Sequence, residues 1–291
     1  MQFLSAIVAG LAVGSIYALL ALAITVVFSV RRVVNFAQGD LVMAAGLVGA
    51  TAITAWGLPY IAGLILAGAA VAALSILIDR VAIKPLAGDE SNIAWILSIV
   101  AVAIILGNAG TLIWGTEPQT FPSLLSSRPV NVAGLRIVPD HLAAIGGAIA
   151  IMVGFHLLQT RTMLGRSMRA VARDSAMAQL LGISVSRSVT IALAISGGMA
   201  AVAGFLIGPI TFVSAGLGFA LGIKGFAAAA LGGLGSFRGA AAGGMILGVA
   251  ETLAVSVIGS ALKDSVALVI LCLILVVKPT GLFGEAPVAK V

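Results

Sequence analysis

Long apolar runs alternate with short polar stretches along the whole of this chain. A helix needs about 20 mainly apolar residues to cross the hydrocarbon core of a bilayer. By that criterion we expect nine apolar segments, near 3–30, 41–57, 58–78, 93–114, 140–158, 188–207, 217–235, 240–259 and 265–277. Several of them are short or interrupted, so we expect eight or nine spans. The pattern predicts an all-α, polytopic transmembrane helix bundle forming a single domain over residues 1–291.

A charged interval between residues 159 and 187 breaks this pattern. Arg166, Arg169 and Arg173 recur there at steps of three and four, so on a helix they share one face. Apolar residues gather on roughly the opposite face: Met168, Val171, Ala172 and Ala178. Gly182 follows as a helix stop. The interval predicts a short amphipathic helix outside the bilayer that docks into a partner's groove. The alternative is a basic loop that only fixes orientation.

Basic residues are distributed very unevenly between the two sides of the predicted topology. If the 159–187 interval is cytoplasmic, twelve of the sixteen lie inside: Arg31, Arg32, Arg80, Lys84, Arg161, Arg166, Arg169, Arg173, Arg187, Arg238, Lys278 and Lys290. Three lie outside: Arg128, Arg136 and Lys263. Because cytoplasmic loops are enriched in Lys and Arg, we expect the C-terminus inside and, with nine spans, the N-terminus outside. The proline-rich interval 115–139 would be the largest outside loop.

Composition supports a membrane protein and excludes several functional classes. Of the 291 residues, 61% are hydrophobic and 9% charged, with a mean hydropathy of +1.21, whereas soluble domains carry about 25% charged residues. The net charge of +6 reflects loop topology, so we expect no nucleic-acid partner. The single cysteine, Cys272, excludes an internal disulfide, and no metal site is expected. No nucleotide-binding, zinc-protease or serine-hydrolase motif occurs, so we expect no catalytic residues and no enzymatic activity in this chain.

Two interruptions fall in corresponding places of the two halves of the chain. The stretch from Asn35 to Asp40 opens a short apolar segment. It is either a cytoplasmic turn with Asp40 near a helix N-terminus, or an unwound stretch inside the protein. In the second half, Gly208–Pro209 is expected to end one segment, and a glycine-rich sequence follows. Interrupted segments in both halves are typical of a translocation pathway near the middle of the membrane.

Two ionisable residues, Lys224 and Glu251, are predicted within the spans. Charges at such depth usually face a bundle interior or an aqueous cavity. These two either contact the transported solute or hold helices together by pairing with each other or with backbone carbonyls. The candidate translocation residues are Asn35, Gln38, Asp40, Lys224 and Glu251.

Six stretches carry a resemblance to a known family: GSIYALLALAITVVFSVRRVVNFAQGD (14–40), RVAIKPL (80–86), GTEPQTFPS (115–123), LGRSMRAVARDSAMAQLLGISVSR (164–187), GFALGIKGFAAAALGGLGSFRGAAAGGMILGVAETL (218–253) and KPTGLFG (278–284). Together they cover nearly the whole chain, which resembles the permease subunits of branched-chain amino acid ABC importers. That family usually has His where this chain has Gln38, so the resemblance assigns no role to this position.

The resemblance implies a multi-pass protein of the bacterial inner membrane. A second permease subunit, a different homologous chain or a copy of this one, would complete the pore. Two cytoplasmic ATPases, binding ATP and Mg²⁺, would drive it, and a periplasmic binding protein would deliver the solute. This chain would bind no cofactor itself. Segment 164–182 would be the coupling helix seated on an ATPase, through Leu164, Gly165, Met168, Arg169, Val171, Arg173, Asp174, Leu181 and Gly182.

The expected solute is a branched-chain or other hydrophobic amino acid. Another member of the same family could carry a different small solute, such as urea, an amide or an aromatic acid. An ion-coupled secondary transporter is a third reading, but the predicted spans hold few of the acidic residues that proton relays use.

Overall fold

A computed structural model of the protein describes residues 2–86, 94–125, 130–132, 135–259 and 263–284. Arg128 and Lys290, which the topology prediction used, lie outside these ranges. The helices are α1 (Gln2–Arg31), α2 (Gln38–Thr54), α3 (Tyr60–Ile78), α4 (Ala94–Trp114), α5 (Pro139–Arg161), α6 (Met163–Arg173), α7 (Ser175–Leu180), α8 (Val185–Thr211), α9 (Leu217–Gly232), α10 (Phe237–Ile258) and α11 (Lys263–Val277). A π-helical turn (Asp79–Ile83) extends α3, and β1 (Val130–Val132) pairs antiparallel with β2 (Leu135–Ile137).

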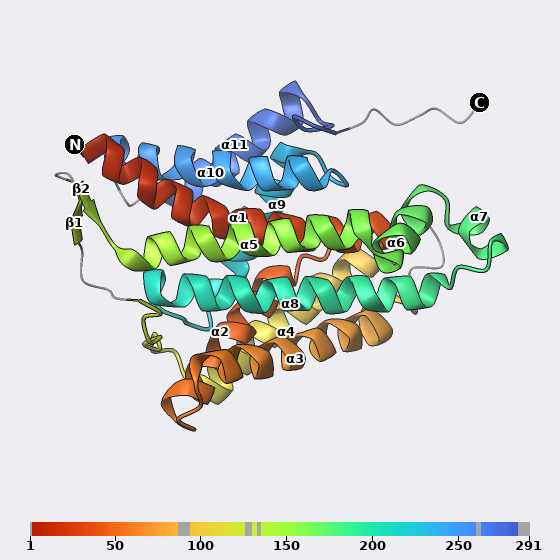
Figure 1. The fold of residues 1–291 in the computed structure, drawn as a ribbon, viewed down its shortest axis with the longest axis horizontal. Coiled ribbons are helices and arrows are strands. Elements are labelled where there is room, and N and C mark those ends of the chain that lie inside the picture. Colours follow the sequence, from red (N-terminus) through yellow and green to blue (C-terminus); the bar gives the residue numbers. More distant parts are fainter. Residues whose placement is uncertain (1, 87–93, 126–129, 133–134, 260–262, 285–291) are drawn as a thin grey trace.

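The helical bundle predicted from the apolar runs is confirmed. Each of the nine predicted segments coincides with a helix. In the part of the chain that the structure describes, six helices are long and apolar enough to cross a membrane: α1, α3, α4, α5, α8 and α10. The other three predicted spans, α2, α9 and α11, are shorter, with 17, 16 and 15 residues. The long helices run lengthwise, with α6 and α7 at one end, called here the α6 end, and β1 and β2 at the other, called the hairpin end (Figure 1).

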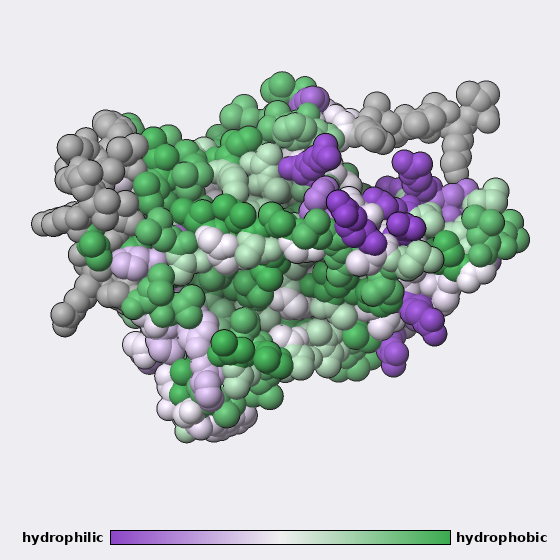
Figure 2. All heavy atoms as spheres, viewed as in Figure 1, coloured by the Kyte–Doolittle hydropathy of each residue, from purple (hydrophilic) through white to green (hydrophobic). Residues whose placement is uncertain are grey.

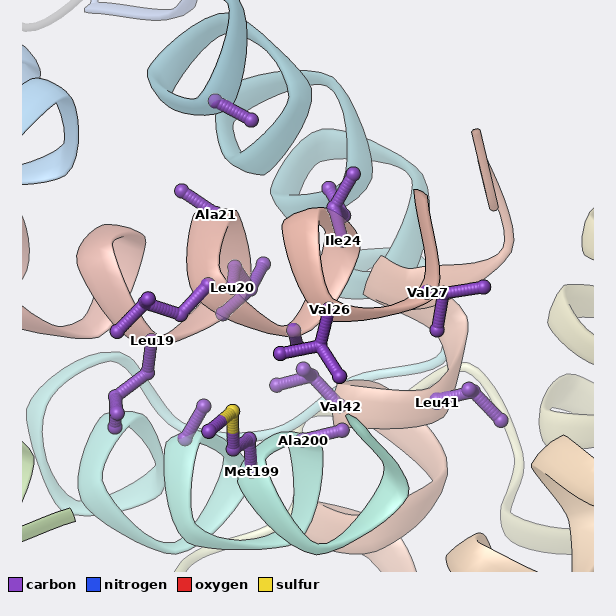
Figure 3. Close-up of a cluster of buried hydrophobic side chains, with 14 of the residues drawn as sticks. Leu19, Leu20, Ala21, Ile24, Val26, Val27, Leu41, Val42, Met199 and Ala200 are labelled. Atoms are coloured by element: carbon purple, nitrogen blue, oxygen red, sulfur yellow. The ribbon is translucent and has the colours of Figure 1, made fainter. Parts of the chain in front are cut away.

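Helix α1 forms the centre of the bundle. It is apolar on all sides, as expected for a helix that is buried all round. Of its most apolar stretch of 18 residues, 83% are buried. Its main neighbours are α10, α8, α9 and α5, and α6 and α2 also contact it. Figure 3 shows side chains of α1, among them Leu19 and Val26, meeting Val42 of α2 and Met199 of α8. By contrast, only 11% of the residues in the most apolar 18-residue stretch of α4 are buried. This helix therefore turns most of its apolar side chains outward.

Small residues let α1 and α10 approach each other closely. Gly10 and Gly14 of α1 lie against Gly244 and Gly248 of α10, and a Cβ built on Gly248 would overlap the backbone of Gly14. Glycines four residues apart form a flat strip on a helix and so allow such backbone contact between membrane helices. The α1–α10 pair is therefore held by backbone packing.

The expected end of a segment at Gly208–Pro209 is wrong, because α8 continues to Thr211. Proline inside a helix leaves the carbonyl four residues earlier without its backbone donor. Here that carbonyl belongs to Phe205, and it accepts a hydrogen bond from the Tyr60 hydroxyl of α3 at 3.1 Å. The side chain from α3 thus replaces the missing donor, and the helix can continue through Pro209.

The 115–139 interval contains more regular structure than expected for a surface loop. Besides the β1–β2 hairpin, Gln119 forms an isolated antiparallel bridge with Val213, which joins the segment after α4 to the segment before α9. Phe121 packs against Tyr60 and Phe205 in edge-to-face geometry. The described part of this loop is therefore fixed over the hairpin ends of α3 and α8.

Candidate functional site

The backbone between α1 and α2 is unwound and lies inside the protein. Val33, Val34, Asn35 and Ala37 are all buried, and α2 begins at Gln38. Of the two interpretations of this stretch, the unwound segment inside the protein agrees with the structure, although Asp40 also occupies the first turn of α2. Non-helical backbone at this depth needs internal hydrogen-bond partners.

Side chains supply some of those partners. The Asn35 side-chain oxygen accepts a hydrogen bond from the backbone N–H of Ala37 at 3.2 Å, which closes a local turn. Gln38 donates from Nε2 to the Ser196 carbonyl of α8 at 3.3 Å and accepts from the Ser196 hydroxyl at 3.0 Å. Asn35 therefore closes the unwound turn, and Gln38 fixes the start of α2 against α8.

The first turns of α2 and α9 meet inside the bundle. A Cβ built on Gly39 would overlap the backbone of Gly218 and Gly222, and one built on Gly218 would overlap the Asp40 carboxylate. Both helices follow a non-helical stretch, so the two interruptions predicted in the two halves are in contact. This contact requires glycine on both helices because any side chain would separate them.

A cavity of about 370 Å³ lies beside this contact. Among its lining residues are Phe36 from the unwound stretch, Asp40 from the first turn of α2, Asn108 and Thr111 from α4, and Phe219 from α9. Its wall is mostly apolar, with one buried carboxylate and a few uncharged polar groups. Such a cavity has room for a small, largely apolar solute that carries a positive group.

Lys224 and Glu251 form a separate buried cluster. The Lys224 Nζ lies 2.7 Å from Glu251 Oε1 of α10 and 2.7 Å from Asp264 Oδ1 of α11. It also lies 5.7 Å above the Tyr17 ring of α1. Lys263 approaches Glu251 Oε1 at 3.9 Å. These charges join α9, α10 and α11 around α1, so the geometry agrees with the interpretation that the pair holds helices together.

The five candidate translocation residues therefore fall into groups with different surroundings. Asn35 and Gln38 fix the unwound backbone, Asp40 lines the cavity, and Lys224 and Glu251 pair on another side of α9. Among the described residues that line the cavity, Asp40 is the only one of the five.

The basic interval folds into two helices at the α6 end. The single helix expected over 164–182 is wrong, because the chain becomes extended at Asp174 (φ −152°, ψ 107°). The Asp174 carboxylate accepts hydrogen bonds from the N–H groups of Ala176 and Met177, both at 2.9 Å, and so caps α7. Gly182 ends the unit with a φ of +80°, as expected for a helix stop.

The expected two faces of this unit are present. Arg166, Arg169 and Arg173 are exposed, whereas Met168, Val171 and Ala178 are buried and Ala172 is half-buried. Figure 2 shows strongly hydrophilic side chains gathered at the α6 end, next to the apolar flank of the bundle. Leu180 and Leu181 are 82% and 73% exposed although they lie beyond the long apolar helices. Large apolar side chains in such a position indicate a surface that a partner covers.

The buried members of the predicted coupling set attach this unit to the bundle. Gly165 lies against the backbone of Leu158 and Gln159 at the end of α5, where a Cβ would overlap. Arg32, after α1, donates to the Ala172 carbonyl at 2.7 Å, and Arg31 binds both carboxylate oxygens of Asp79 at 2.8 and 2.7 Å. Gly165, Met168 and Val171 therefore position the unit, and Leu164, Arg169, Arg173, Leu181 and the neighbouring Leu180 form its outer surface.

Sequence reasoning missed several residues of these sites. Ser196, which holds Gln38, lies in an apolar run and gives no signal in the sequence. Asn108 of α4 and Tyr17 of α1 were missed for the same reason. Asp264 could have been found, since an acidic residue at the start of an apolar segment is a candidate partner for a buried lysine.

Comparison with known proteins agrees with this architecture. Residues 6–277 match the family described as branched-chain amino acid transport system / permease component. The high-affinity branched-chain amino acid transport system permease protein BraD of Pseudomonas aeruginosa is 36% identical over 303 residues, covering 100% of this chain and 98% of BraD. The corresponding protein LivH of Escherichia coli is 34% identical over 306 residues, with the same coverage of both chains.

A solved structure shares the fold. PsaBC from Streptococcus pneumoniae, in complex with a Fab, superposes with a TM-score of 0.52 at 18% identity, covering 96% of this chain and 93% of that one. At this identity the likeness concerns the arrangement of helices only. The match over residues 6–277, the two full-length relatives and the bundle of apolar helices lead to one conclusion: this chain belongs to the family of branched-chain amino acid transport permeases and is a multi-pass permease subunit of the ABC-importer type.

Proposed function

We propose that this chain is one of two permease subunits of an ATP-driven importer that moves branched-chain or other hydrophobic amino acids across the inner membrane. The observation that carries the proposal is the outer surface of α6 and α7. It combines exposed arginines with Leu180 and Leu181 on a unit attached to the long helices. The chain would act as one permease domain without enzymatic activity, and full-length similarity to amino acid permeases supports the choice of solute.

The α6 end would face the cytoplasm, and two ATPases would dock there, one on each permease subunit. The ATPases would bind ATP and Mg²⁺, while this chain would bind neither. Movement of α6 would be transmitted to the bundle through Gly165 on α5 and through the Arg32–Ala172 hydrogen bond after α1. The hairpin end would then face the periplasm and receive the solute-binding protein.

The solute would pass the cavity that Asp40 lines. Helix α4 exposes apolar side chains next to this cavity, among them Ile104 and Ile105. A second permease subunit packed on α4 would close the cavity into a path between the two subunits. The Asp40 carboxylate would attract the ammonium group of an amino acid, and Phe36 and Phe219 would contact its side chain. Asn35, Gln38, Lys224 and Glu251 would maintain the surrounding helices.

Co-purification tests the docking surface directly. Affinity purification of the full-length chain from its own membranes should recover ATPase subunits. Arg173→Glu combined with Leu181→Glu should abolish that recovery while the chain stays inserted. The first substitution reverses a charge at the interface, and the second places an unpaired carboxylate where the partner would cover a leucine. Lys84→Glu is the matched control, since Lys84 is exposed at the same end but lies outside α6 and α7. Equal recovery of ATPases from both variants would contradict the docking proposal.

Transport by the reconstituted complex tests the energy source and the solute. Uptake of leucine should require ATP and persist when an uncoupler removes the proton gradient. Uptake that continues without ATP and stops with the uncoupler would instead identify an ion-coupled transporter. Competition by unlabelled urea, amides or aromatic acids, with no competition by branched-chain amino acids, would assign a different solute to the same mechanism.

A further inference from the structure

A second cavity, of about 510 Å³, opens between α5 and α10 at the α6 end. Two arginines lie at its outer edge, Arg169 from α6 and Arg238 from the first turn of α10. His156 of α5 and the apolar side chains of Met152 and Ala241 line it as well. The cavity therefore has a cationic edge and an apolar interior.

The two arginines are free to bind an anion. Both side chains are exposed, and among the residues that the structure describes neither guanidinium forms an ion pair with a carboxylate. Their positions contrast with Arg31 at the same end, which is occupied by Asp79. The guanidinium group presents several N–H donors in a plane and binds phosphate oxygens with two parallel hydrogen bonds.

The lining residues of α5 lie close to its end at the α6 end, where the apolar sequence gives way to the polar residues 159–161. α5 ends at Arg161, so at 1.5 Å per residue His156 lies about 8 Å and Met152 about 14 Å along the helix from that end. The outer face of α5 exposes Val153 and Leu157 next to the cavity. Phe155 and Phe237 stack edge to face, with centroids 5.3 Å apart, and form a rigid apolar wall.

We propose that this cavity binds an anionic glycerophospholipid, with its phosphate on Arg169 and Arg238 and the start of one acyl chain along α5 and α10. Basic pockets between spanning helices bind such headgroups, and here charge and apolar surface are arranged in the same order as in the lipid. A bound lipid would contact α5, α6 and α10 at once. It would stabilise the attachment of α6 to the bundle.

Native mass spectrometry of the purified full-length chain, with whatever subunits accompany it, tests this site. Phosphatidylglycerol should be retained, and phosphatidylcholine of the same chain length should not. Arg238→Ala should lower phosphatidylglycerol retention about fivefold, because one charged contact to the phosphate is lost. Ala241→Leu, which keeps both charges but fills the apolar interior, should lower it as well. Arg187→Ala, at an exposed arginine outside the cavity, should leave retention unchanged.

The result can be separated from the docking proposal because Arg238 is not part of the α6–α7 outer surface. Arg238→Ala is expected to lose lipid while it retains the ATPases, and Arg173→Glu is expected to do the reverse. The lipid site would be refuted by equal retention of phosphatidylcholine, by unchanged retention in Arg238→Ala, or by a parallel loss of ATPases from that variant. The last outcome would mean that a protein occupies the cavity.

Discussion

Burial distinguishes the two carboxylates that contact Lys224. Glu251 and Asp264 both lie 2.7 Å from its ammonium group, but the Glu251 side chain is 1% exposed and that of Asp264 is 75% exposed. Water screens the exposed contact, so it contributes little to stability. The buried pair instead compensates two charges that would otherwise be desolvated without a partner.

This difference predicts the effects of single substitutions. Glu251→Gln should destabilise the protein by about 3–5 kcal/mol, because Lys224 is left buried with only a screened partner. Asp264→Asn should change the free energy of unfolding by less than about 1 kcal/mol. Thermal unfolding of the detergent-solubilised protein measures both.

A double variant tests whether the protein needs the two charges or only side chains of this size at these positions. Lys224→Met combined with Glu251→Met removes both charges at similar volume, so much of the stability lost in Glu251→Gln should return. Uptake retained in this double variant would support a bracing role for the pair. If the stabilised double variant loses transport completely, the two residues contact the solute after all.

At the scale of helices, the close approach of α1 and α10 depends on positions without side chains. Gly248→Ala should cost about 1–3 kcal/mol, since the new methyl group would meet the backbone of Gly14 and force the helices apart. Gly154→Ala on α5 is the matched control, because nothing beyond the adjacent backbone of α5 itself lies within 4 Å of the added Cβ. Alanine also favours helix over glycine, so the control should be neutral or slightly stabilising. Comparable losses of thermal stability in both variants would contradict backbone packing as the cause.

The positions of the helices could be predicted from sequence because hydrophobic length is a local property. The nine apolar segments and the helices agree within a few residues at most of their boundaries. The sequence could not say which helices the glycines join. The pairing of Gly14 with Gly248 depends on the whole bundle.

The errors have a common origin in contacts between distant segments. The helix break at Asp174 was missed because the spacing of its neighbours continues a helical pattern across it, while the aspartate caps a new helix. The continuation of α8 through Pro209 depends on Tyr60, which lies far away in the sequence. Equally, Asn35 and Asp40 are close in sequence but perform different tasks, one in a turn and one at a cavity wall. Local patterns contain no information of this kind.

For the whole molecule, orientation in the membrane remains a prediction that thiol labelling can test. In a Cys272→Ser background, Leu125→Cys at the hairpin end should react with an impermeant thiol reagent in intact cells, because the hairpin end is expected outside. Met177→Cys at the α6 end should react only after the membrane is permeabilised. Both positions are exposed in this chain, at 65% and 55%. The reverse pattern would invert the proposed topology.

The central position of α1 has a consequence for biosynthesis. This helix precedes all its neighbours in the chain, yet its glycine strip is covered by α10, one of the last helices to be made. Ribosomes deliver a chain from its N-terminal side, so α1 must leave the translocon and persist in lipid long before its main partner exists. Its most apolar stretch of 18 residues has a mean hydropathy of 2.4, so α1 can remain stably inserted in lipid until α10 is made. Final assembly is therefore a late event, in which the finished C-terminal half closes around a helix that was made earlier.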